Sequence, residues 1–220
     1  MKKRVEIGKK ILSANEEYAI ENRQLLAGQK VLCFNMISSP GSGKTTILAE
    51  TIKELKGKIE IGVIEGDIKT DIDAERIRAT EAPAIQIETE GACHLSAMQV
   101  NSALESLLAE ELDLIFIENV GNLVCPSSFE LGENGKIVVL SVAEGDDKPR
   151  KYPGIFAKSK VMLINKIDLL GAVDFDVERA KSDARKLNSG IEIFEISAKT
   201  GEGMADWCDW LKESVKETDF

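Results

Sequence analysis

A glycine-rich stretch near the start of the chain, residues 38–46, reads SSPGSGKTT and follows an apolar run at 31–37. The glycines at 41 and 43 allow successive backbone N–H groups to turn toward one anion, and the helix expected to follow adds its positive end. Lys44 would reach the β- and γ-phosphates, and the Thr45 hydroxyl would bind Mg²⁺. The stretch fits the pattern G-x-x-x-x-G-K-[ST] except that Ser38 replaces the first glycine. We therefore predict a phosphate-binding loop made of Pro40, Gly41, Ser42, Gly43, Lys44, Thr45 and Thr46.

Two short motifs later in the chain have the chemistry to recognise a base. Asn165-Lys166-Ile-Asp168 closes one expected strand, and Ser197-Ala198-Lys199 follows another. The Asp168 carboxylate can accept from the ring N–H and the exocyclic amine of guanine, a pattern that adenine lacks, so ATP would leave it unpaired. Asn165 would tie this loop to the phosphate side, Lys166 would lie along the base, and the backbone of the 197–199 loop would face guanine O6. These motifs predict GTP or GDP as the ligand.

Carboxylates at the ends of two further strands are candidates for holding the metal ion of the nucleotide. Asp67 ends the sequence EGD at 65–67, and Glu118 begins ENVG at 118–121. Together with Thr45 they form the predicted magnesium site, and with Lys44 they form the predicted catalytic group. Gly121 would approach the γ-phosphate through its N–H. Because Asn122 rather than glutamine follows it, we expect slow intrinsic hydrolysis.

Cys93, His94 and Cys125 form a third group with chemical potential. Thiolate and imidazole are ligands for Zn²⁺ and Ni²⁺, but there is no C-x-x-C pair and no second histidine. Three ligands suit an open, exchangeable site or a site shared by two chains across a two-fold axis. Cys93 is expected at the start of a helix, which would lower the pKa of its thiol.

The elements that must position these residues alternate between strand and helix over one domain. The sequence has 220 residues, and 28 basic against 38 acidic residues give a net charge of −10. This charge disfavours nucleic acid and anionic membranes as partners, and no apolar run reaches the roughly 18 residues of a membrane span, so we expect a cytoplasmic protein. Apolar strands are predicted at 31–37, 59–65, 84–88, 112–119, 136–142, 161–165 and 192–196.

This order predicts an α/β protein with a mostly parallel central sheet of about seven strands between two layers of helices. Helices are expected at 4–27, from the glycine-rich stretch to Leu55, around 95–108, at 176–187 and at 204–215. We predict that residues 1–28 form a helix appended to the core and that residues 29–220 form the nucleotide-binding domain.

Taken together, these motifs resemble those of the HypB family of hydrogenase nickel-incorporation GTPases, which are signal-recognition-like P-loop GTPases. The resemblance rests on SSPGSGKTT, EGD, GACHL, ENVGNLVCP, NKID and SAK, and it covers nearly the whole chain from about residue 30. It implies a three-layer P-loop fold and GTP hydrolysis coupled to Ni²⁺ delivery in [NiFe]-hydrogenase maturation. It also implies a GTP-dependent homodimer with Cys93, His94 and Cys125 at its interface, a nickel-transfer partner, and the hydrogenase large subunit as acceptor.

The sequence differs from the family pattern in some places, and other functions are also considered. The chain has no histidine-rich stretch, which argues against nickel storage, and Lys148 is a candidate to reach nucleotide across a dimer. A urease-type nickel GTPase typically has Cys-Pro-His, whereas Cys93 and His94 are adjacent here. A GTPase chaperone that acts through protein contacts alone would leave the Cys/His group incidental. An ATP-dependent kinase is disfavoured by Asp168.

Overall fold

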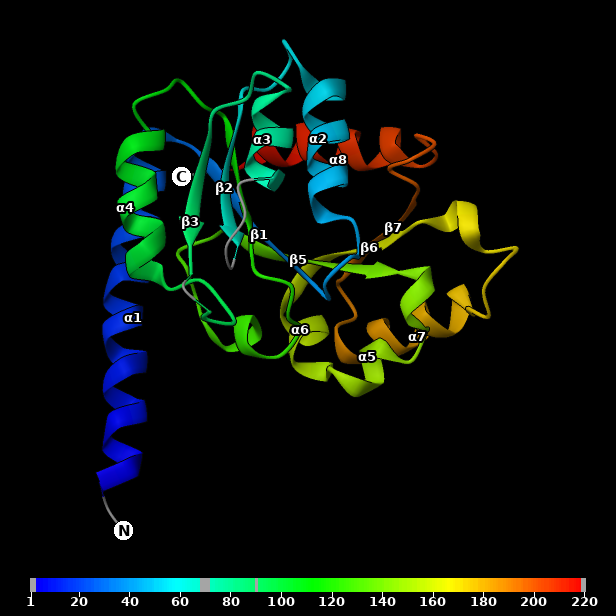
Figure 1. Ribbon diagram of the computed structural model, residues 1–220, viewed down its shortest axis with the longest axis horizontal. Helices are drawn as coiled ribbons and strands as arrows, with labels where there is room; N and C mark the ends of the chain where they lie inside the picture. Colours follow the sequence, from blue (N-terminus) through cyan, green and yellow to red (C-terminus); the bar gives the residue numbers. More distant parts are fainter. Residues whose placement is uncertain (1–2, 68–71, 90, 219–220) are drawn as a thin grey trace.

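A computed structural model describes residues 3–67, 72–89 and 91–218 (Figure 1). Seven strands form one sheet in the order β3-β2-β4-β1-β5-β6-β7, and every pair of neighbours is parallel. The strands are β1 Leu32–Ser38, β2 Ile61–Asp67, β3 Ala84–Glu88, β4 Leu114–Glu118, β5 Gly135–Ser141, β6 Ser159–Asn165 and β7 Glu192–Ile196. The predicted seven-stranded α/β sheet is confirmed, and it is parallel throughout rather than mostly so.

Helices cover both faces of this sheet and make a three-layer arrangement (Figure 1). They are α1 Lys3–Gln29, α2 Lys44–Leu55, α3 Ile72–Arg78, α4 Ala97–Leu107, α5 Lys148–Lys151, α6 Pro153–Lys158, α7 Val177–Leu187 and α8 Met204–Glu217, with short 3₁₀ turns η1 Cys125–Ser128, η2 Val142–Glu144 and η3 Ile167–Leu169. One apolar cluster joins α2, α3 and α8 to the sheet. Two others join α1 and α4, and α6 and α7, to the opposite face.

The central strand β1 shows why these segments form a buried parallel sheet. Phe34 and Met36 belong to the cluster beneath α2 and α8, whereas Cys33 and Ile37 belong to the clusters on the other face. All seven residues of β1 are buried. A strand covered on both faces reads as a continuous apolar run, which is the pattern that predicted it.

Helix α1 packs along α4 (Figure 1). Ala19 and Leu26 join the apolar cluster of α4, and Asn22 lies between them with no solvent exposure. Asn22 Nδ2 donates to the carbonyls of Ala97 at 2.9 Å and Leu131 at 2.8 Å. The division of the chain at residue 28 stays a prediction.

Among the described residues, none of the helices combines the length and the apolar character that crossing a bilayer requires.

Parallel pairing brings the carboxyl ends of all the strands to one edge of the sheet. β1 lies between β4 and β5, so the chain leaves β1 where neighbouring crossovers turn to opposite sides. Such a switch point is where open α/β sheets bind ligands. The motifs that follow β1, β4, β6 and β7 therefore meet at this edge.

Candidate functional site

The loop between β1 and α2 has the backbone shape of an anion nest. Gly41 and Gly43 have φ of 75° and 98°, in the left-handed region that glycine tolerates. Lys44 begins α2 and is buried, with Nζ 3.1 Å from Ser38 Oγ and 3.8 Å from Glu118 Oε1. Ser38, which stands where the pattern has its first glycine, therefore contacts the lysine directly.

The loop after β6 is hydrogen-bonded to this phosphate loop. Asn165 Nδ2 donates to Ser42 O at 2.8 Å, and Lys166 Nζ donates to Gly41 O at 2.7 Å. A Cβ on Gly43 would lie 2.6 Å from Asn165 Nδ2, so only glycine fits there. Asn165 thus connects the end of β6 to the loop between β1 and α2.

A cavity of about 310 Å³ opens beside these bonds. Its lining residues are Gly43, Thr46, Asn165, Lys166, Asp168, Leu169 and Lys199. Asp168 Oδ1 accepts a hydrogen bond from Ser197 Oγ at 2.7 Å, and Ala198 N–H donates to Asn165 Oδ1 at 3.2 Å. The two base motifs, far apart in sequence, therefore make one cavity next to the phosphate loop.

A second cavity, of about 230 Å³, lies on the other side of the loop. Pro40, Gly41, Lys44, Glu65, Gly66, Asp73, Glu118, Asn119, Val120 and Gly121 line it. Glu65 and Glu118 are paired in register between β2 and β4, and both are buried. Burial and the neighbouring carboxylate of Glu118 raise the pKa of Glu65 to about 11, and burial also raises the pKa of Glu118.

The carboxyl oxygens in this cavity fit a magnesium ion. Thr45 Oγ1 donates to Glu118 Oε1 at 3.0 Å, and Glu118 Oε2 and Glu65 Oε1 are buried without a hydrogen-bond partner in the described part of the chain. Two ionised carboxylates cannot bond to one another, so a shared proton or a cation is needed to satisfy them. Hydroxyl and carboxylate oxygens are the ligands that Mg²⁺ prefers.

Glu65 is the residue of this cavity that the sequence reasoning missed. Asp67, the predicted ligand, ends β2, but its side chain lies outside the described residues, as does the segment 68–71. The sequence did contain a signal, since Glu65 and Glu118 are both acidic residues at the ends of apolar strands. Their proximity depends on β2 pairing with β4, which the sequence alone does not reveal.

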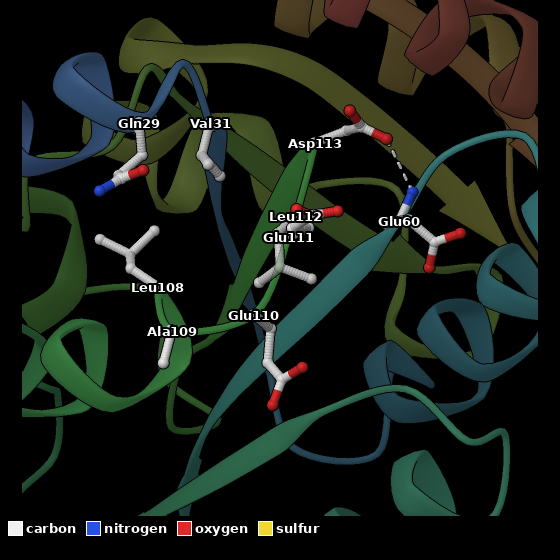
Figure 2. A pocket seen from close by; sticks show the side chains of 9 residues that line it. All are labelled: Gln29, Val31, Glu60, Leu108, Ala109, Glu110, Glu111, Leu112 and Asp113. Carbon is white, nitrogen blue, oxygen red and sulfur yellow. Dashed lines mark hydrogen bonds between the residues drawn. The ribbon is translucent and has the colours of Figure 1, made fainter.

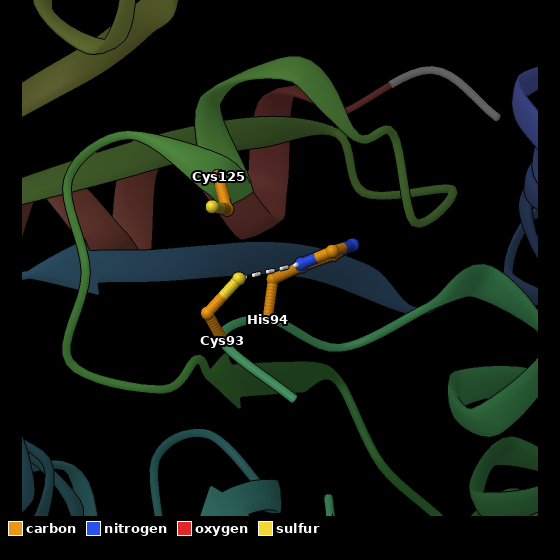
Figure 3. A group of neighbouring side chains, drawn as sticks. All are labelled: Cys93, His94 and Cys125. Atoms are coloured by element: carbon orange, nitrogen blue, oxygen red, sulfur yellow. Dashed lines mark hydrogen bonds between the residues drawn. The ribbon is translucent and has the colours of Figure 1, made fainter. Parts of the chain in front are cut away.

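Cys125, at the start of η1, lies next to Cys93 and His94, which are adjacent on a separate loop (Figure 3). Their nearest ligand atoms all lie within 4.8 Å of one another, and Cys93 Sγ is 3.5 Å from His94 Nδ1. The His94 ring packs against Phe129 with centroids 4.0 Å apart. Burial lowers the pKa of His94, which keeps the imidazole neutral near pH 7. This group could hold a metal ion that accepts sulfur and nitrogen ligands.

The expected helix start at Cys93 is wrong. Helix α4 begins at Ala97, and Ser96 caps it through a capping box with Gln99. Cys93 is therefore too far from the helix dipole to be acidified by it. Instead, hydrogen bonding with the Cys125 thiol holds the pKa of Cys93 above its ordinary value.

The segment from Glu118 to Cys125 joins the second cavity, which we call the phosphate cavity because Lys44 lines it, to the Cys/His group. Glu118 and Gly121 line the cavity, and Cys125 begins η1 beside Cys93. Gly121 lies so close to the phosphate loop that a Cβ there would be 2.9 Å from Pro40 Cα. A movement of the phosphate loop therefore has a direct path to this segment.

Lys148 lies near the phosphate loop of its own chain. Its Nζ is 3.6 Å from Glu144 Oε2, and Glu144 Oε1 accepts a hydrogen bond from Ser42. Whether Lys148 also reaches nucleotide in a second copy stays a prediction.

A further cavity of about 480 Å³ lies away from all of these motifs, at the opposite edge of the sheet (Figure 2). It is bordered by Gln29, Glu60, Glu110 and Asp113, and Asp113 Oδ2 is engaged by the backbone N–H of Glu60 at 2.9 Å. The amino ends of the strands form this edge, so we do not assign the nucleotide to it.

Known proteins show the same sequence pattern and the same fold. Residues 33–195 match the family described as CobW/HypB/UreG, nucleotide-binding domain. Hydrogenase maturation factor HypB of Escherichia coli is 52% identical over 202 residues, which cover 92% of this chain and 70% of that protein.

Two solved structures also match. HypB from Helicobacter pylori in complex with nickel is 38% identical with a TM-score of 0.88, covering 94% of this chain and 100% of that chain. The hydrogenase maturation factor HypB from Archaeoglobus fulgidus is 39% identical with a TM-score of 0.87, covering 93% and 100%. The P-loop GTPase fold expected from the sequence is thereby confirmed.

Proposed function

This chain belongs to the HypB family of hydrogenase maturation factors, and we propose that it hydrolyses GTP to control nickel delivery during [NiFe]-hydrogenase maturation. One observation carries the proposal: a single segment, Glu118 to Cys125, lines the phosphate cavity at one end and reaches the Cys/His group at the other. A ligand can shift such a segment only by binding its two positions with different affinity.

Guanine nucleotide would bind across both cavities. Asp168 would accept from guanine, with the Ser197–Lys199 loop on the opposite edge of the base. Lys44 would contact the phosphates, and Thr45, Glu118 and Asp67 would hold Mg²⁺, which neutralises phosphate charge when bound. Gly121 N–H would face the γ-phosphate.

In hydrolysis, a water oxygen bonds to the γ-phosphorus while the bond to the β–γ bridging oxygen breaks, giving GDP and inorganic phosphate. Lys44 stabilises the negative charge that shifts to the leaving oxygen. The buried carboxyl pair of Glu65 and Glu118 lines the same cavity. With Asn122 where a water-positioning glutamine would stand, the rate is expected to be low, which suits a switch.

Nickel would be the cargo, held by Cys93, His94 and Cys125. Support comes from the proximity of these ligand atoms and from the nickel bound by the related Helicobacter pylori protein. Zn²⁺ accepts the same ligands. Three ligands from one chain leave room for a second copy in a GTP-dependent homodimer, for a nickel-transfer partner, and finally for the hydrogenase large subunit.

Single-turnover nickel release tests this function. The protein is loaded with Ni²⁺ and GTP and mixed with an excess of a coloured nickel chelator, and the reaction is started by adding Mg²⁺. The colour of the chelator reports nickel release, and the release of inorganic phosphate is followed in parallel. The proposal expects chelator capture at the rate of GTP hydrolysis, and much slower capture with ATP or a non-hydrolysable GTP analogue. Equal capture rates with GTP and the analogue would remove hydrolysis from the delivery step.

A further inference from the structure

Two asparagine side chains connect the Glu118–Cys125 segment to the loop that carries Cys93. Asn119 Oδ1 accepts from the backbone N–H of Leu95 at 3.2 Å. Asn122 Nδ2 donates to the carbonyl of Cys93 at 3.3 Å. The stretch Cys93–Leu95 is therefore held at both ends by one neighbouring segment. We call these two residues the asparagine clamp.

Asn119 is the fixed side of the clamp. It is buried, and its Nδ2 donates to Asn35 Oδ1 at 3.2 Å in the centre of the sheet. Asn35 in turn donates to Glu133 Oε1 at 3.1 Å, and Glu133 is paired with the buried Lys136 at 2.8 Å. A satisfied buried network of this kind keeps its geometry. Asn119 therefore fixes the position of the Leu95 backbone relative to the sheet.

Asn122 is the movable side of the clamp. It is half-buried and directly follows Gly121, the residue packed against Pro40 of the phosphate loop. Its Oδ1 also accepts from Val124 N–H at 2.9 Å, one residue before Cys125. A displacement of Gly121 would therefore reach Cys93 through Nδ2 and Cys125 through Oδ1 of the same side chain.

We propose that the asparagine clamp is the link through which nucleotide state sets the separation of the Cys93 and Cys125 sulfurs. The hydrogen bond from Leu95 N–H to Asn119 keeps Leu95 in a fixed position. The hydrogen bond from Asn122 to the Cys93 carbonyl then moves Cys93 relative to Leu95 when Asn122 is displaced. Both are positioning residues, since neither supplies a ligand atom to the Cys/His group. The inference rests on the proposed function, because it needs a metal whose affinity depends on nucleotide.

The test is the ratio of Ni²⁺ affinities between the GTP-analogue and GDP forms, measured by chelator competition on the full chain with Mg²⁺. Asn122→Ala removes both bonds, and Asn122→Asp keeps the acceptor for Val124 but loses the donor to Cys93. Ser127→Ala is the matched control, since Ser127, in the adjoining η1, donates from Oγ to Val124 O at 2.7 Å. Thermal denaturation confirms that each variant is folded.

Typical coupling between two sites is about 5- to 150-fold, and we expect roughly tenfold or more in the wild-type chain and in Ser127→Ala. In both Asn122 variants the ratio should fall to within about twofold of one. A merely structural role would lower both affinities and leave their ratio unchanged, and that result would overturn the clamp alone. A wild-type ratio of one would overturn the proposed function and the clamp with it.

Discussion

Replacing Asp168 with asparagine isolates the part of nucleotide binding that recognises the base. In the structure, Asp168 Oδ1 accepts from Ser197 Oγ at 2.7 Å, and an amide oxygen in the same place would still accept that bond. The residues that line the cavity should therefore keep their positions in this variant. The change falls on the second oxygen, which becomes an N–H donor facing the donors of guanine.

The expected loss follows from the two bonds that the carboxylate would make to guanine. One bond to a charged acceptor disappears, which costs about 1.5–3 kcal/mol, and the other becomes neutral and weaker by about 0.5–1.5 kcal/mol. The sum is about 2–4.5 kcal/mol, or roughly 30- to 2000-fold in GDP affinity. Xanthine has a carbonyl where guanine has its exocyclic amine, so Asp168→Asn should bind xanthosine diphosphate more tightly than the wild-type chain does.

Competition against a fluorescent GDP measures both effects, with GDP and xanthosine diphosphate as competitors. Asp174→Asn is the matched control, because Asp174 is exposed and lies outside the cavity lining. The control should bind GDP as the wild type does. If Asp168→Asn kept its GDP affinity within about threefold, and gained nothing for xanthosine diphosphate, the assignment of Asp168 to the base would be refuted.

Three other perturbations test the remaining parts of the site. Gly43→Ala would place a Cβ 2.6 Å from Asn165 Nδ2 at a φ of 98°, so titration should show at least about tenfold weaker GDP binding, and unchanged binding would contradict the described loop. The neighbouring Cys125 thiol raises the pKa of Cys93, so Ni²⁺ must displace the proton of the Cys93 thiol when it binds. The Cys93 thiol alone should therefore raise the affinity for nickel by about tenfold per pH unit between about pH 6.5 and 8.5. Cys93→Ser should lower this slope by about one, and an equal slope would exclude Cys93 as a ligand. The pKa of Glu65 is about 11 in the folded chain and has its ordinary value of 4.5 in the unfolded chain. Between these two pH values the folded chain holds a proton that the unfolded chain has lost. The free energy of unfolding of the nucleotide-free chain should therefore fall as the pH rises, by at most about 1.4 kcal/mol per pH unit. Denaturant melts at pH 6 and 8.5 should show a smaller fall for Glu65→Gln than for the wild type, and parallel falls would refute the shared-proton pair.

The local sequence was sufficient to predict those elements whose structure depends on neighbouring residues alone. The strands at Ala84–Glu88 and Glu192–Ile196 were predicted to the residue, because apolar β-formers are bounded there by turns. The turn before α2 was predicted for a similar reason, since glycine is required at the left-handed φ of residue 43. The true start of α4 was also readable, because Ser96 and Gln99 fit the capping-box pattern that was overlooked.

The features that were missed depend on long-range packing. The adjacency of Glu65 and Glu118 follows from β4 entering the sheet between β2 and β1, which no local pattern specifies. The raised pKa of Cys93 depends on Cys125 arriving from another loop. The asparagine clamp likewise joins residues on separate loops, and asparagine in a loop is too common in sequences to single out.

The most direct measurement of the central claim is the equilibrium affinity for Ni²⁺ in the two nucleotide states, by chelator competition on the wild-type chain with GDP and with a non-hydrolysable GTP analogue. We predict that the two dissociation constants differ by about tenfold or more, which is about 1.4 kcal/mol of coupling between the phosphate cavity and the Cys/His group. Equal dissociation constants would mean that the two sites are energetically independent, and would contradict a nickel switch driven by GTP.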